Sequence, residues 1–204
     1  MPTLRLPRHT ELTAASRLAV LTSPSEVASA REFVLLALAG VTAAFCSTFL
    51  DLNVKVPGHA VLRSVFPMAL GLALAPRKGG GVVMGLSAGV TVLAMRLGLL
   101  TGHGPGLGAM TSLLACGPLL DAALWRARAG WQLWLGFAAA GLGANVIAFL
   151  VRGGAKAGGG HGAATLPAWL QVAPLTYAAC GLAAGLLSGM VWFAYRRRLP
   201  GDGP

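Results

Sequence analysis

Two groups of residues in this sequence have types and spacing that could support catalysis. Residues 85–89 read GLSAG and match the G-x-S-x-G pattern around the nucleophile of serine hydrolases. That pattern requires a strand-turn-helix setting, whereas Ser87 lies inside an apolar stretch, so we interpret the glycines as packing residues. His59, His103 and His161 fall between apolar stretches and could bind a metal together, but their separate loops favour solvated side chains. We therefore expect no catalytic residue, no metal site and no cofactor.

Polar side chains inside or beside apolar stretches are stronger candidates for a binding site. A charge at the centre of a bilayer costs at least ~2.5 kcal/mol, so such residues are usually functional or paired. Arg63 suits an anionic substrate group, and Asp121 could equally form a structural ion pair with Arg126. The candidate substrate-binding residues are Asn53, His59, Arg63, Arg96, Asn145 and Trp169.

The composition indicates the elements that must position these residues. Hydrophobic residues make up 55% of the 204 positions and charged residues only 11%, with a mean hydropathy of +0.70. A soluble domain carries about 25% charged residues, so this chain is expected to be an integral membrane protein in contact with lipid. The net charge is +10, but basic and aromatic residues do not alternate as they do on nucleic-acid surfaces. We interpret the basic residues as those that accumulate at the cytoplasmic face of a membrane protein. The cysteines Cys46, Cys116 and Cys180 are expected to be packing residues.

Six apolar stretches approach the length of about 20 residues that crosses a bilayer. They lie at 33–50, 61–75, 81–100, 107–124, 131–151 and 172–195. The sequence thus predicts an all-α bundle of six transmembrane helices over 31–195, between an N-terminal segment, 1–30, and a basic tail, 196–204. Most basic residues fall in alternate connections and at both ends, which predicts that both termini are cytoplasmic.

The connections carry further signals. Ser23 and Glu26 have the spacing of a capping box, which predicts that the first helix begins there. The segment 51–60 contains Pro57 and Gly58, and we expect an irregular loop that could serve as a lid. The glycine-rich segment 152–164 is expected to be a flexible loop and a possible second gate. Small residues recur at four-residue spacing, which favours close helix packing or the docking of another subunit.

The chain resembles the S-component, or substrate-capture subunit, of energy-coupling factor transporters. The resemblance covers roughly residues 33–195. It rests on six short spans, on the stretch from Pro57 through the basic turn at Arg77 to Gly81, and on the stretch from Gly104 to Asp121. No vitamin-specific signature and no Met-His start accompany it, so the resemblance leaves the substrate class open.

The resemblance implies a multi-pass protein of the bacterial cytoplasmic (inner) membrane that takes part in vitamin or micronutrient uptake. Substrate would bind near the outer face, under the loop after the first span and the loop between the fifth and sixth. A transmembrane T-component and two cytoplasmic ATPases would drive transport, and Ala39, Ala43 and Ser47 would form the docking face for that partner.

Three other functions remain open from the sequence. The main alternative is a six-span membrane regulator of the anti-sigma kind, which would act through residues 1–30. An intramembrane enzyme would depend on Ser87, and an independent small transporter would move solute without partners.

Overall fold

The computed structural model describes residues 7–9, 12, 29–50, 57–127, 130–159 and 166–193. Within these residues, each of the six apolar stretches coincides with one α-helix, which confirms the prediction of an all-helical chain. The helices are α2 (Ala30–Phe49), α3 (Ala60–Leu74), α4 (Gly80–Arg96), α5 (Leu107–Leu124), α6 (Gly130–Gly158) and α8 (Leu166–Trp192). Four of them, α2, α5, α6 and α8, are long and apolar enough to cross a membrane, whereas α3 and α4 are shorter apolar helices.

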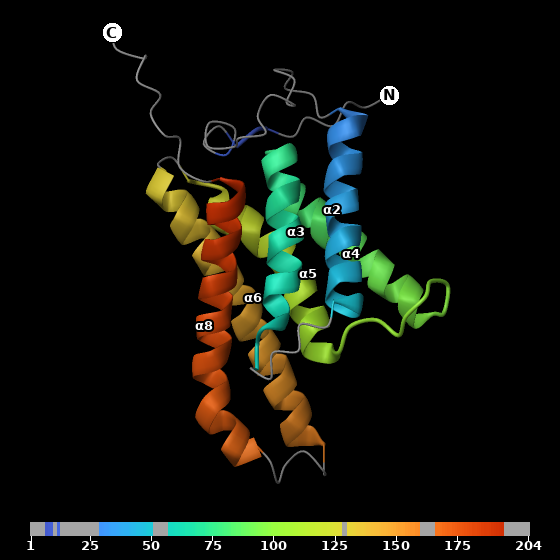
Figure 1. Ribbon diagram of the computed structural model, residues 1–204, viewed down its shortest axis with the longest axis vertical. Coiled ribbons are helices and arrows are strands. Elements are labelled where there is room, and N and C mark those ends of the chain that lie inside the picture. Colours follow the sequence, from blue (N-terminus) through green and yellow to red (C-terminus); the bar gives the residue numbers. More distant parts are fainter. Residues whose placement is uncertain are drawn as a thin grey trace.

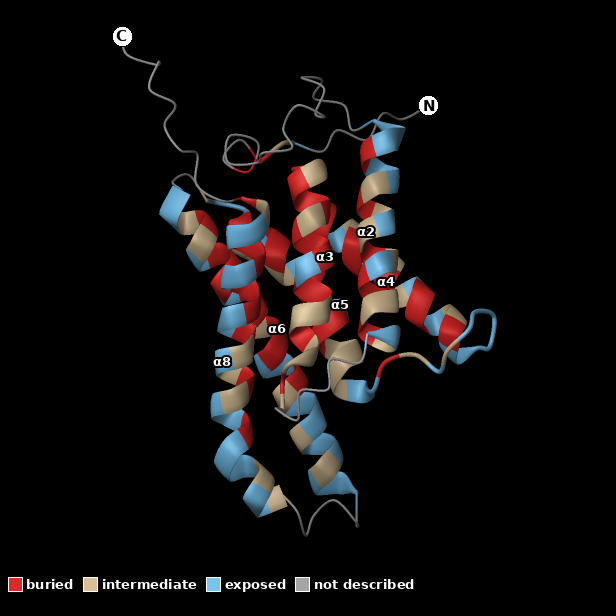
Figure 2. Ribbon diagram, viewed as in Figure 1, coloured by how far each residue is buried: buried red, intermediate tan, exposed pale blue. Residues whose placement is uncertain are grey.

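The helices form a ring in which each packs against two neighbours, in the order α2, α4, α5, α6, α8 and α3. α3 also contacts α5 across the ring, and Figure 2 shows that most of its surface is buried. Its buried side chains include Val61, Val65, Met68 and Leu72. The outer faces of the surrounding helices carry exposed apolar side chains instead, such as Leu86 and Leu175. Apolar side chains on the outside of the bundle are compatible with a protein surrounded by lipid.

Glycines let two pairs of helices approach closely. A Cβ atom at Gly117 of α5 would lie 2.1 Å from the carbonyl oxygen of Gly81 in α4. In the same way, a Cβ at Gly185 of α8 would lie 2.1 Å from the carbonyl oxygen of Phe137 in α6. The small-residue stripes of these helices are therefore occupied by contacts within the chain, as expected for helices that pack backbone to backbone.

The first helix begins later than predicted. Ser29 is its N-cap, with an extended backbone (φ −72°, ψ 150°), so a helix does not continue through it from Ser23. Ser29 and Glu32 form the capping box, in which the Ser29 hydroxyl accepts from the Glu32 amide and the Glu32 carboxylate accepts from the Ser29 amide. The prediction chose Ser23 and Glu26 although Ser29 and Glu32 have the same spacing and lie directly before the apolar run.

The third apolar stretch also ends earlier than predicted, at Arg96 instead of residue 100. Gly98 has φ +73°, its amide donates to the Met95 carbonyl, and the Leu99 amide donates to the Ala94 carbonyl. This is the Schellman arrangement, in which a glycine in the left-handed region closes a helix. Residues 97–100 are mostly apolar, so the sequence prediction did not recognise Gly98 as the end of the helix.

α6 and α8 are longer than predicted and extend as a pair beyond the other helices (Figure 1). α6 continues to Gly158, so residues 152–158 are helical and not the flexible loop that we expected. Trp169 of α8 explains this extension, because its ring stacks on Phe149 with centroids 5.1 Å apart and lies near Lys156. The rest of the expected gate, residues 160–164, lies outside the described part of the chain.

The N-terminal segment is attached to the turn between α3 and α4. The His9 amide donates to the Pro76 carbonyl, and the Lys78 amide donates to the Pro7 carbonyl. Glu32 links this turn to α2, because its carboxylate accepts from the buried Arg77 at 2.8 Å and from Arg8 at 3.3 Å. Burial lowers the pKa of His9 from 6.5 to about 4, with a smaller contribution from the charge of Lys78.

Candidate functional site

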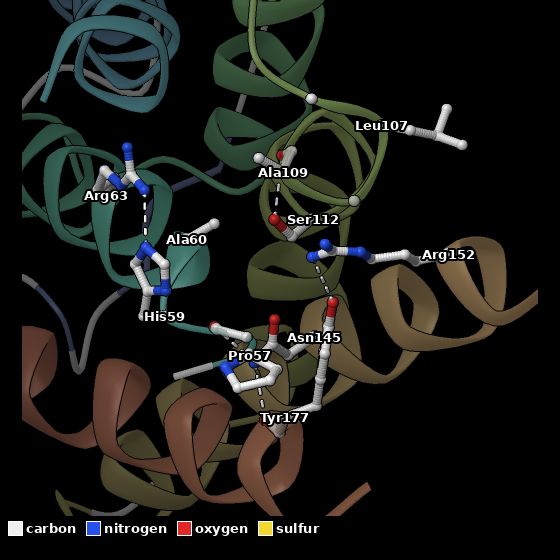
Figure 3. A pocket seen from close by; sticks show the side chains of 13 residues that line it. Pro57, His59, Ala60, Arg63, Leu107, Ala109, Ser112, Asn145, Arg152 and Tyr177 are labelled. Atoms are coloured by element: carbon white, nitrogen blue, oxygen red, sulfur yellow. Dashed lines mark hydrogen bonds between the residues drawn. The ribbon is translucent and has the colours of Figure 1, made fainter. Parts of the chain in front are cut away.

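A cavity of about 330 Å³ lies at the end of the bundle where α3 and α5 begin (Figure 3). The turn before α3, the first turns of α3 and α5, two positions on α6 and one on α8 form its wall. The lining residues are Pro57, Gly58, His59, Ala60, Arg63, Gly106, Leu107, Gly108, Ala109, Ser112, Asn145, Arg152 and Tyr177. The cavity thus combines small and apolar surface with a few polar groups, as small-molecule sites do.

The corner at Gly58 fixes one side of the cavity. Gly58 has φ +91°, and a Cβ there would lie 2.9 Å from both Asn145 Nδ2 and Tyr177 Cα. Asn145 is buried, and its Nδ2 donates to the carbonyl oxygens of Gly58 at 3.0 Å and of Tyr177 at 2.7 Å. One side-chain amide therefore holds the turn before α3 against α8 through two carbonyl groups.

His59 and Arg63 are one helical turn apart and form a contact on the opposite side. Arg63 Nη2 lies 2.9 Å from His59 Nε2, and Arg63 Nη1 donates to the Leu50 carbonyl at the end of α2. A guanidinium group can only donate, so His59 Nε2 is the acceptor in this contact. Arg63 Nε is buried and has no hydrogen-bond acceptor among the described residues.

Arg152, Tyr177 and Ser112 also line the cavity, and the sequence interpretation did not include them. Arg152 Nη1 donates to Tyr177 Oη at 3.4 Å, and the buried Ser112 hydroxyl donates to the Ala109 carbonyl at 3.0 Å. Arg152 is seven residues after Asn145, which places both on the same face of α6, so helical spacing was a signal for Arg152. No comparable signal exists for Tyr177, because only the packing of α8 on α6 brings it here.

The charged side chains of the described cavity wall are both arginines, Arg63 and Arg152. The described wall contains two arginines and one histidine, and no aspartate or glutamate. In the sequence as a whole, Asp51 is the only acidic residue between Glu32 and Asp121, and it lies outside the described residues.

The six residues that we predicted to bind substrate are not all in one place. His59, Arg63 and Asn145 meet at the cavity. Arg96 is the exposed last residue of α4 and donates to the Pro105 carbonyl at 3.5 Å, outside the cavity wall. Trp169 packs edge-on behind Tyr177, with ring centroids 6.2 Å apart, and does not line the cavity either. Asn53 lies outside the described residues, as does the part of the expected lid at 51–56.

The stripe that we predicted to dock a partner lies inside the bundle. Ala43 and Ser47 are buried, and a Cβ at Gly71 of α3 would lie 2.7 Å from Ala39 Cβ. The exposed face of α2 carries Phe33 and Leu38 instead. A docking role for Ala39, Ala43 and Ser47 stays a prediction, and this packing counts against it because the three side chains present little surface.

Two further residues have structural partners. Asp121 accepts from the backbone amides of Gly79 at 3.1 Å and Val82 at 2.7 Å, so it caps the start of α4. The ion pair with Arg126 was one of two roles that the sequence left open. Ser87 donates to the Met84 carbonyl of its own helix at 3.0 Å and lies against Gly40 of α2.

The part of the chain that the structure describes holds no group of three or more histidine, cysteine or acidic residues that could bind a metal. His161, one of the three histidines considered for such a site, lies outside that part. No protein family model, curated protein or solved structure matches this chain.

Proposed function

We propose that this chain is the substrate-binding membrane subunit of an energy-coupling factor type importer for a vitamin or another small micronutrient. It crosses the bacterial inner membrane six times with both termini in the cytoplasm. A separate transmembrane T-component and ATPase subunits supply the energy, because the sequence contains no nucleotide-binding motif of its own.

The cavity is the observation that carries this proposal. It is of small-molecule size and lies at the end of the bundle opposite the start of α2 and the end of α8 (Figure 1). With cytoplasmic termini, the cavity faces the exterior, where a capture subunit meets its substrate. Residues 51–56, part of the lid that we predicted, precede Pro57 in the sequence and lie outside the described residues.

The short helices are compatible with six crossings because protein covers their ends. At about 1.5 Å per residue, α3 spans roughly 22 Å, which is less than the hydrocarbon core of about 30 Å. The C-terminal end of α3 leads into the turn that binds the segment at Arg8 and His9, and its N-terminal end lies at the cavity. Backbone that leaves the helix at membrane depth is tolerated where protein or a water-filled cavity surrounds it.

Charge at the two ends supports this orientation. Arg31, Arg77, Lys78 and Arg126 lie at the end that carries the termini of the bundle. Lys156, Arg96 and the two cavity arginines lie at the other end. The excess at the first end comes from the further basic residues that the sequence places in the N-terminal segment, before α6 and in the C-terminal tail. Positive charge is enriched on the cytoplasmic side of membrane proteins, which favours a cytoplasmic location of the first end.

Ligand capture predicts that the purified chain binds a small molecule without partners. Native mass spectrometry of the chain, released from its own membrane in mild detergent, should show a bound compound in a 1:1 complex. Ser112→Leu fills the cavity from a buried wall position and should abolish this complex, whereas Leu86→Ala on the exposed face of α4 should keep it. A wild-type chain that carries no compound and is not stabilised by any metabolite would contradict the proposal.

The regulator alternative is not favoured by the described N-terminal residues. Leu12 is completely buried, the His9 amide donates to the Pro76 carbonyl of the turn after α3, and Arg8 donates to Glu32 of α2. A segment that captures a cytoplasmic partner would have to leave these contacts first.

A further inference from the structure

We infer that the cavity recognises a compact small molecule through an anionic oxygen group, either a carboxylate or a phosphate. This inference rests on the proposed function, because it names the chemical class of the captured substrate. Three observations carry it: the charges of the wall, the donors that the wall leaves unused, and the size of the space.

The two guanidinium groups approach the cavity from different helices. Figure 3 shows Arg63 on α3 at one side and Arg152 on α6 at the other, with the Arg152 guanidinium directed toward Ser112 and Asn145. His59 adds an imidazole beside Arg63. At most one carboxylate, that of Asp51, belongs to a neighbouring segment, so the two arginines retain an excess of positive charge. A cationic ligand would be repelled here, and a neutral one would leave this charge without compensation.

Both arginines retain donors for a ligand. A guanidinium group carries five N–H donors in a planar arrangement that matches a carboxylate or phosphate. Arg152 makes one long hydrogen bond, to Tyr177 Oη, and is otherwise exposed. Arg63 contacts His59 and Leu50, and its buried Nε has no acceptor among the described residues. A carboxylate or phosphate in the cavity would accept charge-assisted hydrogen bonds from the remaining donors of a guanidinium group.

The remaining wall selects for a small ligand with an apolar part. The volume of about 330 Å³ is near the lower end of the range of roughly 300–1,000 Å³ for ligand sites. Pro57, Ala60, Leu107 and Ala109 line it with apolar atoms. A compact organic acid or an organic phosphate fits both the charge and the volume.

The test measures ligand-induced thermal stabilisation of the purified full-length chain in neutral-lipid nanodiscs. The probes are a library of small carboxylic acids and organic phosphates, each paired with its neutral amide or alcohol, together with inorganic phosphate alone. Stabilising compounds should be confined to the anionic members. For the best of them, Arg152→Gln and Arg63→Gln should each raise the Kd by about 10–100-fold. Arg96→Gln removes an exposed arginine outside the cavity and should leave the Kd unchanged.

The outcomes separate this inference from the proposed function. Neutral partners that stabilise as well as their acids, or arginine variants that bind normally, would overturn the anionic class while leaving ligand capture intact. If no compound of either kind stabilises the chain, both proposals fail. If Arg63→Gln does not fold, Arg152→Gln decides, because Arg152 is exposed and makes one weak contact. Anionic-lipid nanodiscs complete the design, since stabilisation by them without added solute, lost in Arg152→Gln, would identify a lipid headgroup as the source of the oxyanion.

Discussion

At the scale of single residues, Gly58 is the position on which the cavity most depends. Its positive φ and its contacts with α6 and α8 both exclude a side chain. The Pro57-Gly58 pair predicted a break in regular structure, and the structure adds that this break is held closed by Asn145.

Gly58→Ala should destabilise the protein by more than a left-handed backbone alone explains. A non-glycine residue in this region costs about 1–2 kcal/mol, and the new Cβ must also displace Asn145 or Tyr177. Gly98→Ala is the matched control, because Gly98 has φ +73° and a Cβ there meets nothing within 4 Å. Thermal unfolding in detergent should rank the loss for Gly58→Ala above that for Gly98→Ala, and equal losses would contradict the proposed corner.

His9 should make the stability of the chain depend on pH. Its pKa is 6.5 in the unfolded chain and about 4 in the folded one, so the unfolded state binds more protons between these values. Stability should therefore be full above pH 6.5 and fall as the pH decreases toward 4. His9→Gln removes this titration, and chemical unfolding from pH 4 to pH 7 should show a shallower slope than in the wild type. If stability depends on pH equally in both proteins, the His9 ring is exposed to water and the lowered pKa is wrong.

At the scale of secondary-structure elements, glycine decides how close two helices can lie. The contact of α4 with α5 has Gly81 facing Gly117, and a side chain on either would meet the other's backbone. The outward positions of the same helices carry large apolar residues, which can face lipid.

Gly117→Ala should separate α4 from α5 and lower the free energy of unfolding by about 1–3 kcal/mol. Gly154→Ala, on α6 where a Cβ meets nothing within 4 Å, is the control and should gain about 0.5–1 kcal/mol from helix propensity. Denaturation with increasing SDS measures both. A neutral Gly117→Ala would show that the backbone contact contributes little.

The turn between α3 and α4 should depend on Glu32 more than on any surface charge. Arg77 is 1% exposed, and its side chain donates to Glu32 through both Nε and Nη2. Glu32→Ala leaves that buried guanidinium without its carboxylate and should cost about 3–5 kcal/mol. Arg8→Ala removes the longer and more exposed contact and should cost about 1 kcal/mol or less, so equal losses in thermal unfolding would contradict this difference.

At the scale of the whole molecule, the start of α2 and the end of α8 lie at the same end of the bundle (Figure 1). The cavity and the paired extensions of α6 and α8 lie at the other end. The proposed function requires this second end to face the exterior.

Thiol labelling tests that orientation in intact cells. In a background without Cys46, Cys116 and Cys180, Gly159→Cys should react with a membrane-impermeant reagent. Arg126→Cys, an equally exposed position at the opposite end, should react only after the cells are permeabilised. The reverse pattern would place the cavity in the cytoplasm and exclude substrate capture from outside.

For the described residues, the sequence by itself was sufficient for the number, order and approximate bounds of the apolar helices. A run of apolar residues indicates by itself a segment that is buried in lipid or protein, so no information about distant residues is needed. Errors arose where a single residue stops or extends a helix, as at Gly98, or where a distant ring supports it, as Trp169 supports the end of α6.

The candidate site was only half predictable from the sequence. His59, Arg63 and Asn145 were found because polar groups in apolar surroundings are conspicuous, but the same criterion also selected Arg96 and Trp169, which lie elsewhere. Which polar groups share one cavity depends on the closing of the ring of helices. Only that packing brings Arg152 and Tyr177 to Arg63, because it sets distances between residues more than 80 positions apart, and no local pattern encodes them.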